Sequence, residues 1–219
     1  MKQISNDIFQ INLGSVNVFL VGDTLIDTGF KGSTEKIFSA LTKAGKEPHD
    51  IKRIILTHCH PDHTGSAAEL KAILKVPVYA HEQDAILIED GIGGGRMHLT
   101  PGIINWLVYQ LIIKKAGNSI DPLFIDVKVK DGDMIDDMRV IHTPGHSDGH
   151  ISLLIKDVLI AADICANVTG LAYSTLYEDI KQGRESILRA ASFNFEKAVF
   201  GHGGPILKDA AKKLYKKFA

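Results

Sequence analysis

Residues 57–63 read THCHPDH and hold three histidines and an aspartate within six positions. The segment Arg53–Leu56 directly before them has the apolar character of a short buried strand, and a helical pattern follows them. Imidazole nitrogens and carboxylate oxygens are ligands that zinc, iron and similar ions accept. Because such a cluster has little structural use in an apolar core, we expect it to lie on a loop above a sheet and to bind metal.

Three further candidate ligands occur later in the chain, each at the end of a predicted strand and beside small residues. Small neighbours let the backbone approach a metal site closely. Together with the first cluster they give seven candidates, whereas a closed structural zinc site needs four ligands. We therefore favour a reactive metal site, with the candidates His58, His60, Asp62, His63, His146, Asp163 and His202.

The segments around these loops alternate between strand and helix patterns. Alternating β-branched residues predict strands in Ile8–Ile11 and Val16–Val21, and helical spacing runs over Ser33–Ala44 and about Ser66–Leu74. Strand, helix, strand, helix is typical of an α/β layered domain. A similar pattern returns in the second half of the chain. Since no Pro/Gly/Ser-rich linker interrupts the sequence, we predict one α/β domain over residues 1–219, built of two similar halves.

The motif His-x-His-x-Asp-His at 58–63, with the later ligands in the same order, resembles the metallo-β-lactamase superfamily. The resemblance covers nearly the whole chain, from Asp-Thr-Gly at 27–29 to Gly-His-Gly at 201–203. It implies a four-layer αβ/βα sandwich with the metals along one edge of the sheets. It also implies a binuclear site, in which one metal is held by His58, His60 and His146 and the second by Asp62, His63 and His202, with Asp163 bridging the two.

The chemistry implied for such a site is hydrolysis. Two divalent cations about 3.5–4 Å apart lower the pKa of a bridging water and present hydroxide at neutral pH. The hydroxide attacks a carbonyl carbon while a metal polarises the carbonyl oxygen, and Asp62 is the catalytic residue that orients the nucleophile. Zinc is the expected metal, with iron and manganese as alternatives that the same ligands accept.

Two more residues are candidates for orienting the ligands. Asp27 lies in an Asp-Thr-Gly context that resembles the family's, and ligating histidines usually donate their second N–H to such a partner. His150 has two interpretations of equal weight, which are support of a ligand and a plain hydrogen bond within a hairpin.

Residues 82–118 depart from the alternating rhythm and predict a helical insertion, with an apolar helix over Gly102–Lys115. Insertions near this point of the superfamily commonly roof the active site. We therefore predict that Trp106 and Tyr109, together with Tyr173, form an apolar wall for a small-molecule substrate. The alternative for the insertion is a homodimer contact.

Asp163 argues against true β-lactamase activity, because those members lack an aspartate at the bridging position. Glyoxalase II enzymes and N-acyl homoserine lactonases match all seven ligands, although the lactonases place a tyrosine where this chain has Ala166. We therefore predict a hydrolase of an ester, thioester or lactone bond. The alternatives are a persulfide dioxygenase with one iron, held by residues that match His58, His146 and Asp163, and a non-catalytic metal-binding module.

Composition and charge argue against some classes of binding partner. The 25 basic and 26 acidic residues give a formal net charge of -1, so no global basic field favours nucleic acid. The longest apolar stretch, Ile103–Ile113, is too short to span a bilayer, so we expect no membrane insertion. Two cysteines cannot form a disulfide framework, and residues 1–10 lack a signal-peptide pattern, which together predict a cytoplasmic protein.

Overall fold

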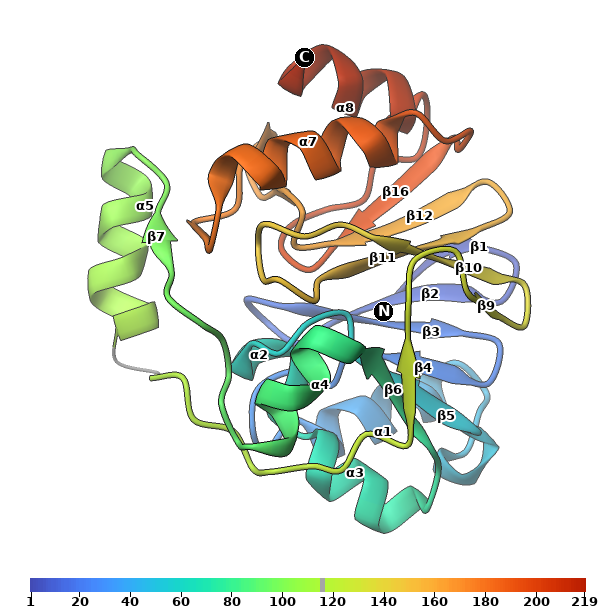
Figure 1. The fold of residues 1–219 in the computed structure, drawn as a ribbon. Helices are drawn as coiled ribbons and strands as arrows, with labels where there is room; N and C mark the ends of the chain where they lie inside the picture. The colour runs from blue at the N-terminus through green and yellow to red at the C-terminus, as the bar shows by residue number, and fades with distance from the viewer. Residues whose placement is uncertain (115–116) are drawn as a thin grey trace.

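The computed structural model describes residues 1–114 and 117–219, and two β-sheets face each other at its centre (Figure 1). The first sheet is antiparallel from β1 to β4 and parallel from β4 to β8. In sheet order its strands are β1 (Lys2–Ser5), β2 (Ile8–Asn12), β3 (Asn17–Val21), β4 (Thr24–Ile26), β5 (Arg53–Ile55), β6 (Val78–His81) and β8 (Val127–Val129).

The second sheet is antiparallel apart from its parallel pair β12 and β16. In sheet order its strands are β16 (Lys197–Phe200), β12 (Val158–Ala162), β11 (Ile151–Ile155), β10 (Met138–His142) and β9 (Met134–Ile135). Two short ribbons lie outside the large sheets and pair β13 (Ala166–Asn167) with β14 (Leu171–Ala172), and β15 (Leu176–Tyr177) with β7 (His98–Leu99).

Helices cover the outer faces of both sheets, which makes four layers (Figure 1). On the side of the first sheet lie α1 (Thr34–Lys43), the 3-10 helix η1 (Pro48–Asp50), α2 (Pro61–Thr64), α3 (Ala67–Leu74) and α4 (Glu82–Glu89). On the second sheet lie α7 (Ile180–Ala191) and α8 (Ala210–Phe218). Apart from both sheets stands α5 (Ile103–Val108), which continues into η2 (Tyr109–Ile113).

Three apolar cores separate the four layers, and neighbouring strand residues alternate between them. In β4, Leu25 packs in the core beneath α1 and α3, whereas Ile26 packs in the core between the sheets. In β12, Ile160 lies between the sheets, and Leu159 packs in the core beneath α7 and α8. This alternation follows from the period of two along a strand, and burial of both faces explains why these strands read as continuous apolar runs. The predicted four-layer sandwich is confirmed.

The structure refines the elements predicted for residues 82–118. The chain there forms α4, β7, α5 and η2 rather than one helix after an irregular stretch. The helix predicted over Gly102–Lys115 begins at Ile103, and from Tyr109 it continues as a π-helix. Its predicted last residue, Lys115, lies outside the described residues. No helix in the described ranges is both long and apolar enough to cross a membrane.

The helix α7 begins at Ile180, three residues after Tyr177. Asp179 sets this start, because its side chain accepts hydrogen bonds from the backbone N–H groups of Lys181 and Gln182. An N-cap of this kind satisfies donors that the first helical turn leaves free. Tyr177 instead belongs to β15 and is fully buried.

Candidate metal centre

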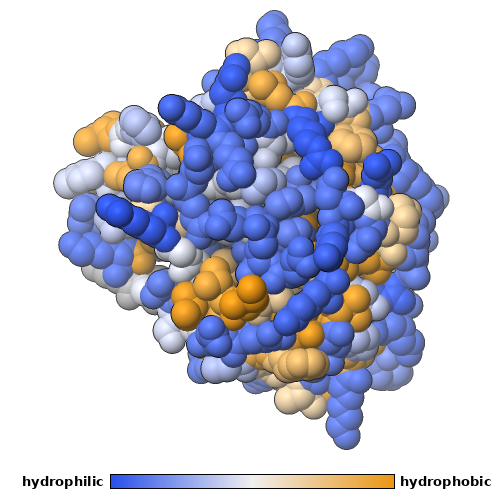
Figure 2. Space-filling model, in the orientation of Figure 1, coloured by the Kyte–Doolittle hydropathy of each residue, from blue (hydrophilic) through white to orange (hydrophobic). Residues whose placement is uncertain are grey.

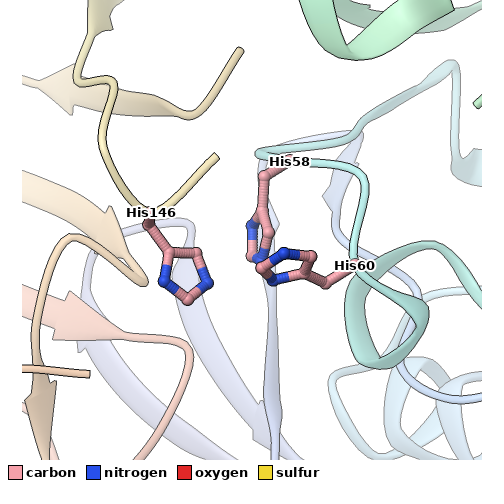
Figure 3. Close-up of side chains that lie close together, drawn as sticks. All are labelled: His58, His60 and His146. Atoms are coloured by element: carbon pink, nitrogen blue, oxygen red, sulfur yellow. The ribbon is translucent and has the colours of Figure 1, made fainter. Parts of the chain in front are cut away.

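The seven candidate ligands lie in four loops at one edge of the sandwich, after β5, β10, β12 and β16, and the loop after β5 includes the single helical turn α2 with Asp62 and His63. Figure 3 shows the ring of His146, from the second sheet, facing those of His58 and His60, from the first. The structure thus brings all seven candidates together. Within each of three overlapping groups the ligand atoms lie within 4.8 Å of one another, and the groups are His58, His60 and His146; His58, His63 and Asp163; and Asp62, His63 and His202.

The centre is deeply buried. His58 and His63 are 0% exposed, and Asp163 is 3% exposed. Most of the buried side-chain polar atoms that lack a hydrogen-bond partner, within the described part of the chain, belong to the candidate ligands. They are Nε2 of His58, His60, His63 and His146 and Oδ1 of Asp163. Because a buried polar atom without a partner is costly, a cation at this place fits what these residues lack.

Four of the histidine rings are held through Nδ1. The partners are Thr57 Oγ1 for His58 (3.0 Å), Asp27 Oδ2 for His63 (2.8 Å), the Leu176 carbonyl for His146 (2.9 Å) and the Ser15 carbonyl for His202 (2.7 Å). Carbonyl and carboxylate oxygens only accept hydrogen bonds, so Nδ1 carries the proton in the rings of His63, His146 and His202. In its neutral form such a ring offers the lone pair of Nε2, which is the arrangement that metal-ligating histidines use.

Asp27 is buried and orients two of the candidate ligands. Its Oδ2 accepts a hydrogen bond from His63 Nδ1 at 2.8 Å. The same oxygen accepts from Thr57 Oγ1 at 2.8 Å, and Oδ1 accepts from the Thr57 backbone N–H at 2.8 Å. Since Thr57 Oγ1 donates to Asp27, it is an acceptor for His58 Nδ1. Asp27 therefore holds His63 directly and His58 through Thr57.

His150 forms a hydrogen bond with the backbone of a candidate ligand and not with a ligand ring. Its Nε2 accepts a hydrogen bond from the Asp163 backbone N–H at 3.1 Å, while Nδ1 contacts Thr143 Oγ1 at 2.8 Å. The strand register between β12 and β16 shifts just before this point, and Ala162 adopts a positive φ of 47°. Such irregularities re-aim a side chain, and here the residue that follows is Asp163.

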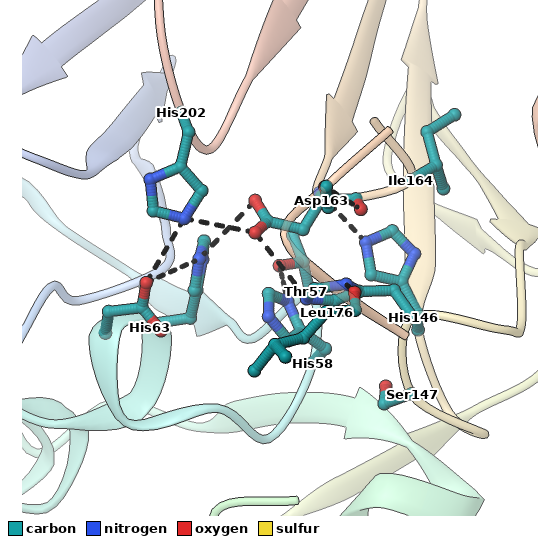
Figure 4. A network of polar contacts seen from close by, with 12 residues as sticks. Thr57, His58, His63, His146, Ser147, Asp163, Ile164, Leu176 and His202 are labelled. Atoms are coloured by element: carbon teal, nitrogen blue, oxygen red, sulfur yellow. Dashed lines mark hydrogen bonds and ion pairs between the residues drawn. The ribbon is translucent and has the colours of Figure 1, made fainter. Parts of the chain in front are cut away.

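The charges of the centre favour ionised aspartates and a neutral His58, but they favour the protonated form of His63. Burial, followed by the neighbouring histidines, lowers the pKa of His58 well below its usual range. Burial alone would raise the pKa of Asp163, but His202 and His63 hold it well below the ordinary value. Burial would likewise lower the pKa of His63, yet the surrounding aspartates raise it to about 9. Figure 4 shows this network of carboxylate and imidazole contacts around Asp163.

The segment 82–118 reaches the centre through its glycine-rich loop and through β7. A Cβ at Gly94, which has a φ of +121°, would lie 2.9 Å from Cδ2 of His60, so this backbone covers one side of the imidazole. In the β7–β15 ribbon, Leu99 pairs with Leu176, whose carbonyl accepts the hydrogen bond from His146. The segment therefore supports two of the candidate ligands.

The predicted wall residues lie on α5, on η2 and between β14 and β15. Trp106 is 48% exposed on α5, Tyr109 begins η2, and the ring of Tyr173 lies 5.0 Å from that of Phe218 in α8. Figure 2 shows hydrophobic side chains over α4 and again on α5, within a mostly hydrophilic face. The exposed hydrophobic residues of the α5–η2 segment include Ile103, Ile104, Trp106, Leu107 and Leu111.

Sequence reasoning did not identify several residues that support the centre. Ser15 and Leu176 act through their backbone carbonyls, which any residue supplies, so no residue type marks them. Thr57 stands directly before the histidine motif, and its hydroxyl was a detectable signal. Asp84 accepts hydrogen bonds from both histidine loops, and nothing in its local sequence points to that role.

A four-layer αβ/βα sandwich with histidines and aspartates gathered at one edge defines the class of protein. The chain belongs to the metallo-beta-lactamase superfamily, whose family model matches residues 11–202.

Individual relatives agree with this membership. The chain is 31% identical over 205 residues to "Probable metallo-hydrolase YflN" of Bacillus subtilis, covering 83% of this chain and 75% of that protein. It is 27% identical over 204 residues to "Thioesterase pkgB" of Emericella nidulans, covering 90% of this chain but 48% of that protein, so it spans about half of that relative. BJP-1, a subclass B3 metallo-beta-lactamase of Bradyrhizobium japonicum, shares the fold with a TM-score of 0.72 at 22% identity, covering 98% of this chain and 87% of that chain.

Proposed function

We propose that this protein is a binuclear metal-dependent hydrolase that cleaves an ester, thioester or lactone bond in a small-molecule substrate. The observation that carries the proposal is the convergence of seven histidine and aspartate side chains, from four separate loops, on one buried centre. Buried imidazole nitrogens without hydrogen-bond partners support the presence of a cation there. Two divalent ions, with zinc as the first candidate, fit this set of ligands.

The candidate ligands fall into two groups, one for each ion. One ion would be held by His58, His60 and His146, the other by Asp62, His63 and His202, and Asp163 would contact both. When bound, such ions supply an activated water at neutral pH and polarise a carbonyl oxygen. Asp62 is suited to orient that water, because its Oδ2 lies 3.2 Å from His202 Nε2 and its side chain is 20% exposed toward solvent. Asp27 keeps the His63 ring in place during the reaction.

Asp163 and the exposed apolar residues of α5 and η2 support the proposed substrate class. The aspartate at position 163 supports the glyoxalase II and lactonase-like branch of the superfamily over true β-lactamases, since it supplies a carboxylate between the two groups of ligands. A relative whose name is a thioesterase agrees with this choice. The exposed apolar residues of α5 and η2 favour a substrate with an apolar portion.

Metal analysis combined with a substrate panel tests the proposal. The purified protein should hold two divalent ions per chain and should hydrolyse members of an ester, thioester and lactone series. His146→Ala should reduce kcat/KM by at least about 100-fold, since loss of a ligand outweighs loss of an outer partner, which costs about 10–100-fold. The matched control is His49→Ala, because the His49 side chain is 81% exposed and belongs to none of the three ligand groups.

Two outcomes would favour a different function for the protein. One iron per chain together with oxygen uptake on a glutathione persulfide would favour a dioxygenase that uses His58, His146 and Asp163. Full metal loading without turnover on any activated ester, thioester or lactone would favour a non-catalytic metal-binding module.

A further inference from the structure

Asp84 is a buried carboxylate in the first turn of α4 and is 1% exposed. Its two oxygens accept three hydrogen bonds from outside its own helix. Oδ2 accepts from the Cys59 backbone N–H at 2.8 Å and from Ser147 Oγ at 2.7 Å. Oδ1 accepts from the Gly149 backbone N–H at 2.7 Å. Three donors therefore converge on one side chain that can only accept.

These donors lie on the two loops that carry the first group of candidate ligands. Cys59 stands between His58 and His60 in the loop after β5 of the first sheet. Ser147 directly follows His146, in the loop between β10 and β11 of the second sheet, and is labelled below it in Figure 4. One carboxylate thus connects the two sheets at the point where their histidines meet.

The close approach of Gly149 to Asp84 requires glycine. A Cβ at this position would lie 2.5 Å from Oδ1 and 2.6 Å from Cγ of Asp84, and it would also overlap the Asp84 backbone nitrogen. Contacts of that length are too short for any side chain, and the neighbouring atoms are buried. The loop after β10 is therefore shaped around this carboxylate.

We propose that Asp84 is a positioning residue that fixes the spacing of His58 and His60 relative to His146, and so sets the metal affinity of that group. The inference rests on the proposed metal-dependent function. Asp27 holds the His63 ring directly, whereas Asp84 acts on the loops that hold His58, His60 and His146. Hydrogen bonds to an ionised acceptor are stronger and shorter than neutral ones, so the carboxylate holds both loops firmly.

The isosteric change Asp84→Asn removes this positioning with little change in volume. Its amide nitrogen would replace either Oδ1, opposite the Gly149 N–H, or Oδ2, opposite the Cys59 N–H, and both orientations place a donor against a donor. Loss of an outer partner of metal ligands weakens metal binding by about 10–100-fold. We expect that loss at the group formed by His58, His60 and His146.

The readout is the number of Zn²⁺ ions retained per chain and their affinity, measured by competition with a chromophoric chelator. The wild-type protein should retain two ions, and Asp84→Asn should retain one under the same conditions. Asp126→Asn is the matched control. That carboxylate also accepts a hydrogen bond from a backbone N–H, that of Val78 at 2.8 Å, and it forms an ion pair with Lys71. The control should lose stability and still retain two ions.

Combined variants identify which group is affected. Adding His146→Ala to Asp84→Asn should release no further ion, because both changes weaken the same group. Adding His202→Ala should release the remaining ion. Retention of two ions at wild-type affinity by Asp84→Asn, or a further loss on adding His146→Ala, would overturn the inference while leaving the proposed function intact. A wild-type protein without ions would overturn both.

A milder variant keeps the test valid should Asp84→Asn fail to fold. Ser147→Ala removes one of the three hydrogen bonds and leaves the carboxylate in place. It should weaken Zn²⁺ binding a few-fold at the first group and leave the second group unchanged. The control Ser192→Ala removes a serine hydrogen bond at the end of α7 and should leave both affinities at the wild-type value. Equal affinities in the two serine variants would overturn the inference.

Discussion

Asp27→Asn is the sharpest test of how the centre holds its second group of ligands. The variant keeps the shape of the side chain but turns one oxygen into an N–H donor. An amide nitrogen at the Oδ1 position would face the Thr57 backbone N–H, which cannot become an acceptor. At the Oδ2 position it would face His63 Nδ1, and the ring would have to move its proton to Nε2. Asp27→Asn therefore either leaves a buried N–H without an acceptor or removes the Nε2 lone pair of His63 that would bind metal.

The structure sets the size of the effect. A buried donor without an acceptor costs about 1–3 kcal/mol, so the metal-free protein should lose stability of that order. Loss of an outer partner reduces metal affinity by about 10–100-fold, which corresponds to about 1.4–2.7 kcal/mol at about 1.36 kcal/mol per factor of ten. Both losses should occur together because one side chain supplies all these hydrogen bonds.

Chemical unfolding of the metal-free protein and Zn²⁺ titration against a chelator measure the two quantities separately. Asp133→Asn is a suitable control, since Asp133 accepts the Lys130 backbone N–H on an exposed turn. The control should leave the Zn²⁺ affinity unchanged. Wild-type Zn²⁺ affinity in Asp27→Asn would refute the view that this carboxylate fixes the His63 ring for metal binding.

Three further outcomes are expected. Chelation should lower Tm, and free Zn²⁺ at about 100 times its Kd should restore about 2.7 kcal/mol of stability by calorimetry; a Tm indifferent to metal would contradict binding. Trp106→Ala should lower kcat/KM on long-chain esters and spare short ones, and a flat chain-length series would exclude the apolar wall. Burial would raise the pKa of Asp131, but the Arg189 hydrogen bond and the His142 backbone N–H lower it. The contribution of the Asp131 carboxylate to the free energy of unfolding is therefore present above the unfolded-state pKa of about 3.9, and it is lost as the pH falls through the folded-state pKa. The free energies of unfolding of the wild type and Asp131→Asn should therefore differ at neutral pH and converge only at acid pH.

The candidate ligands were predictable because their signal is local. Histidines and aspartates at 58–63 crowd one loop, and each later ligand follows an apolar strand. Strands that are buried on both faces read as continuous apolar runs, and this made their carboxyl ends visible in the sequence. Asp27 was identified from its Asp-Thr-Gly context, which resembles that of the family, and in the structure it directly follows the buried strand β4.

The remaining features depend on contacts that sequence spacing does not record. Asp84 lies 25 positions from Cys59 and 63 from Ser147, and its role exists only once the two sheets have packed together. The helix α4 that carries it is short, so the periodicity that would predict it spans barely two turns. The π-helical turn from Tyr109 follows an apolar run that is equally compatible with a regular helix.

Exposure of the ligands defines the side from which a substrate approaches. The side chains of Asp62 and His202 are 20% and 27% exposed, whereas those of His146 and Asp163 are 5% and 4% exposed. Gly94 covers one side of the His60 ring. We therefore expect an incoming molecule to meet Asp62 and His202 first, with the histidines held through Asp84 behind them. Because this group is enclosed, we infer that the protein itself fixes its geometry through the buried carboxylate of Asp84, which joins both loops.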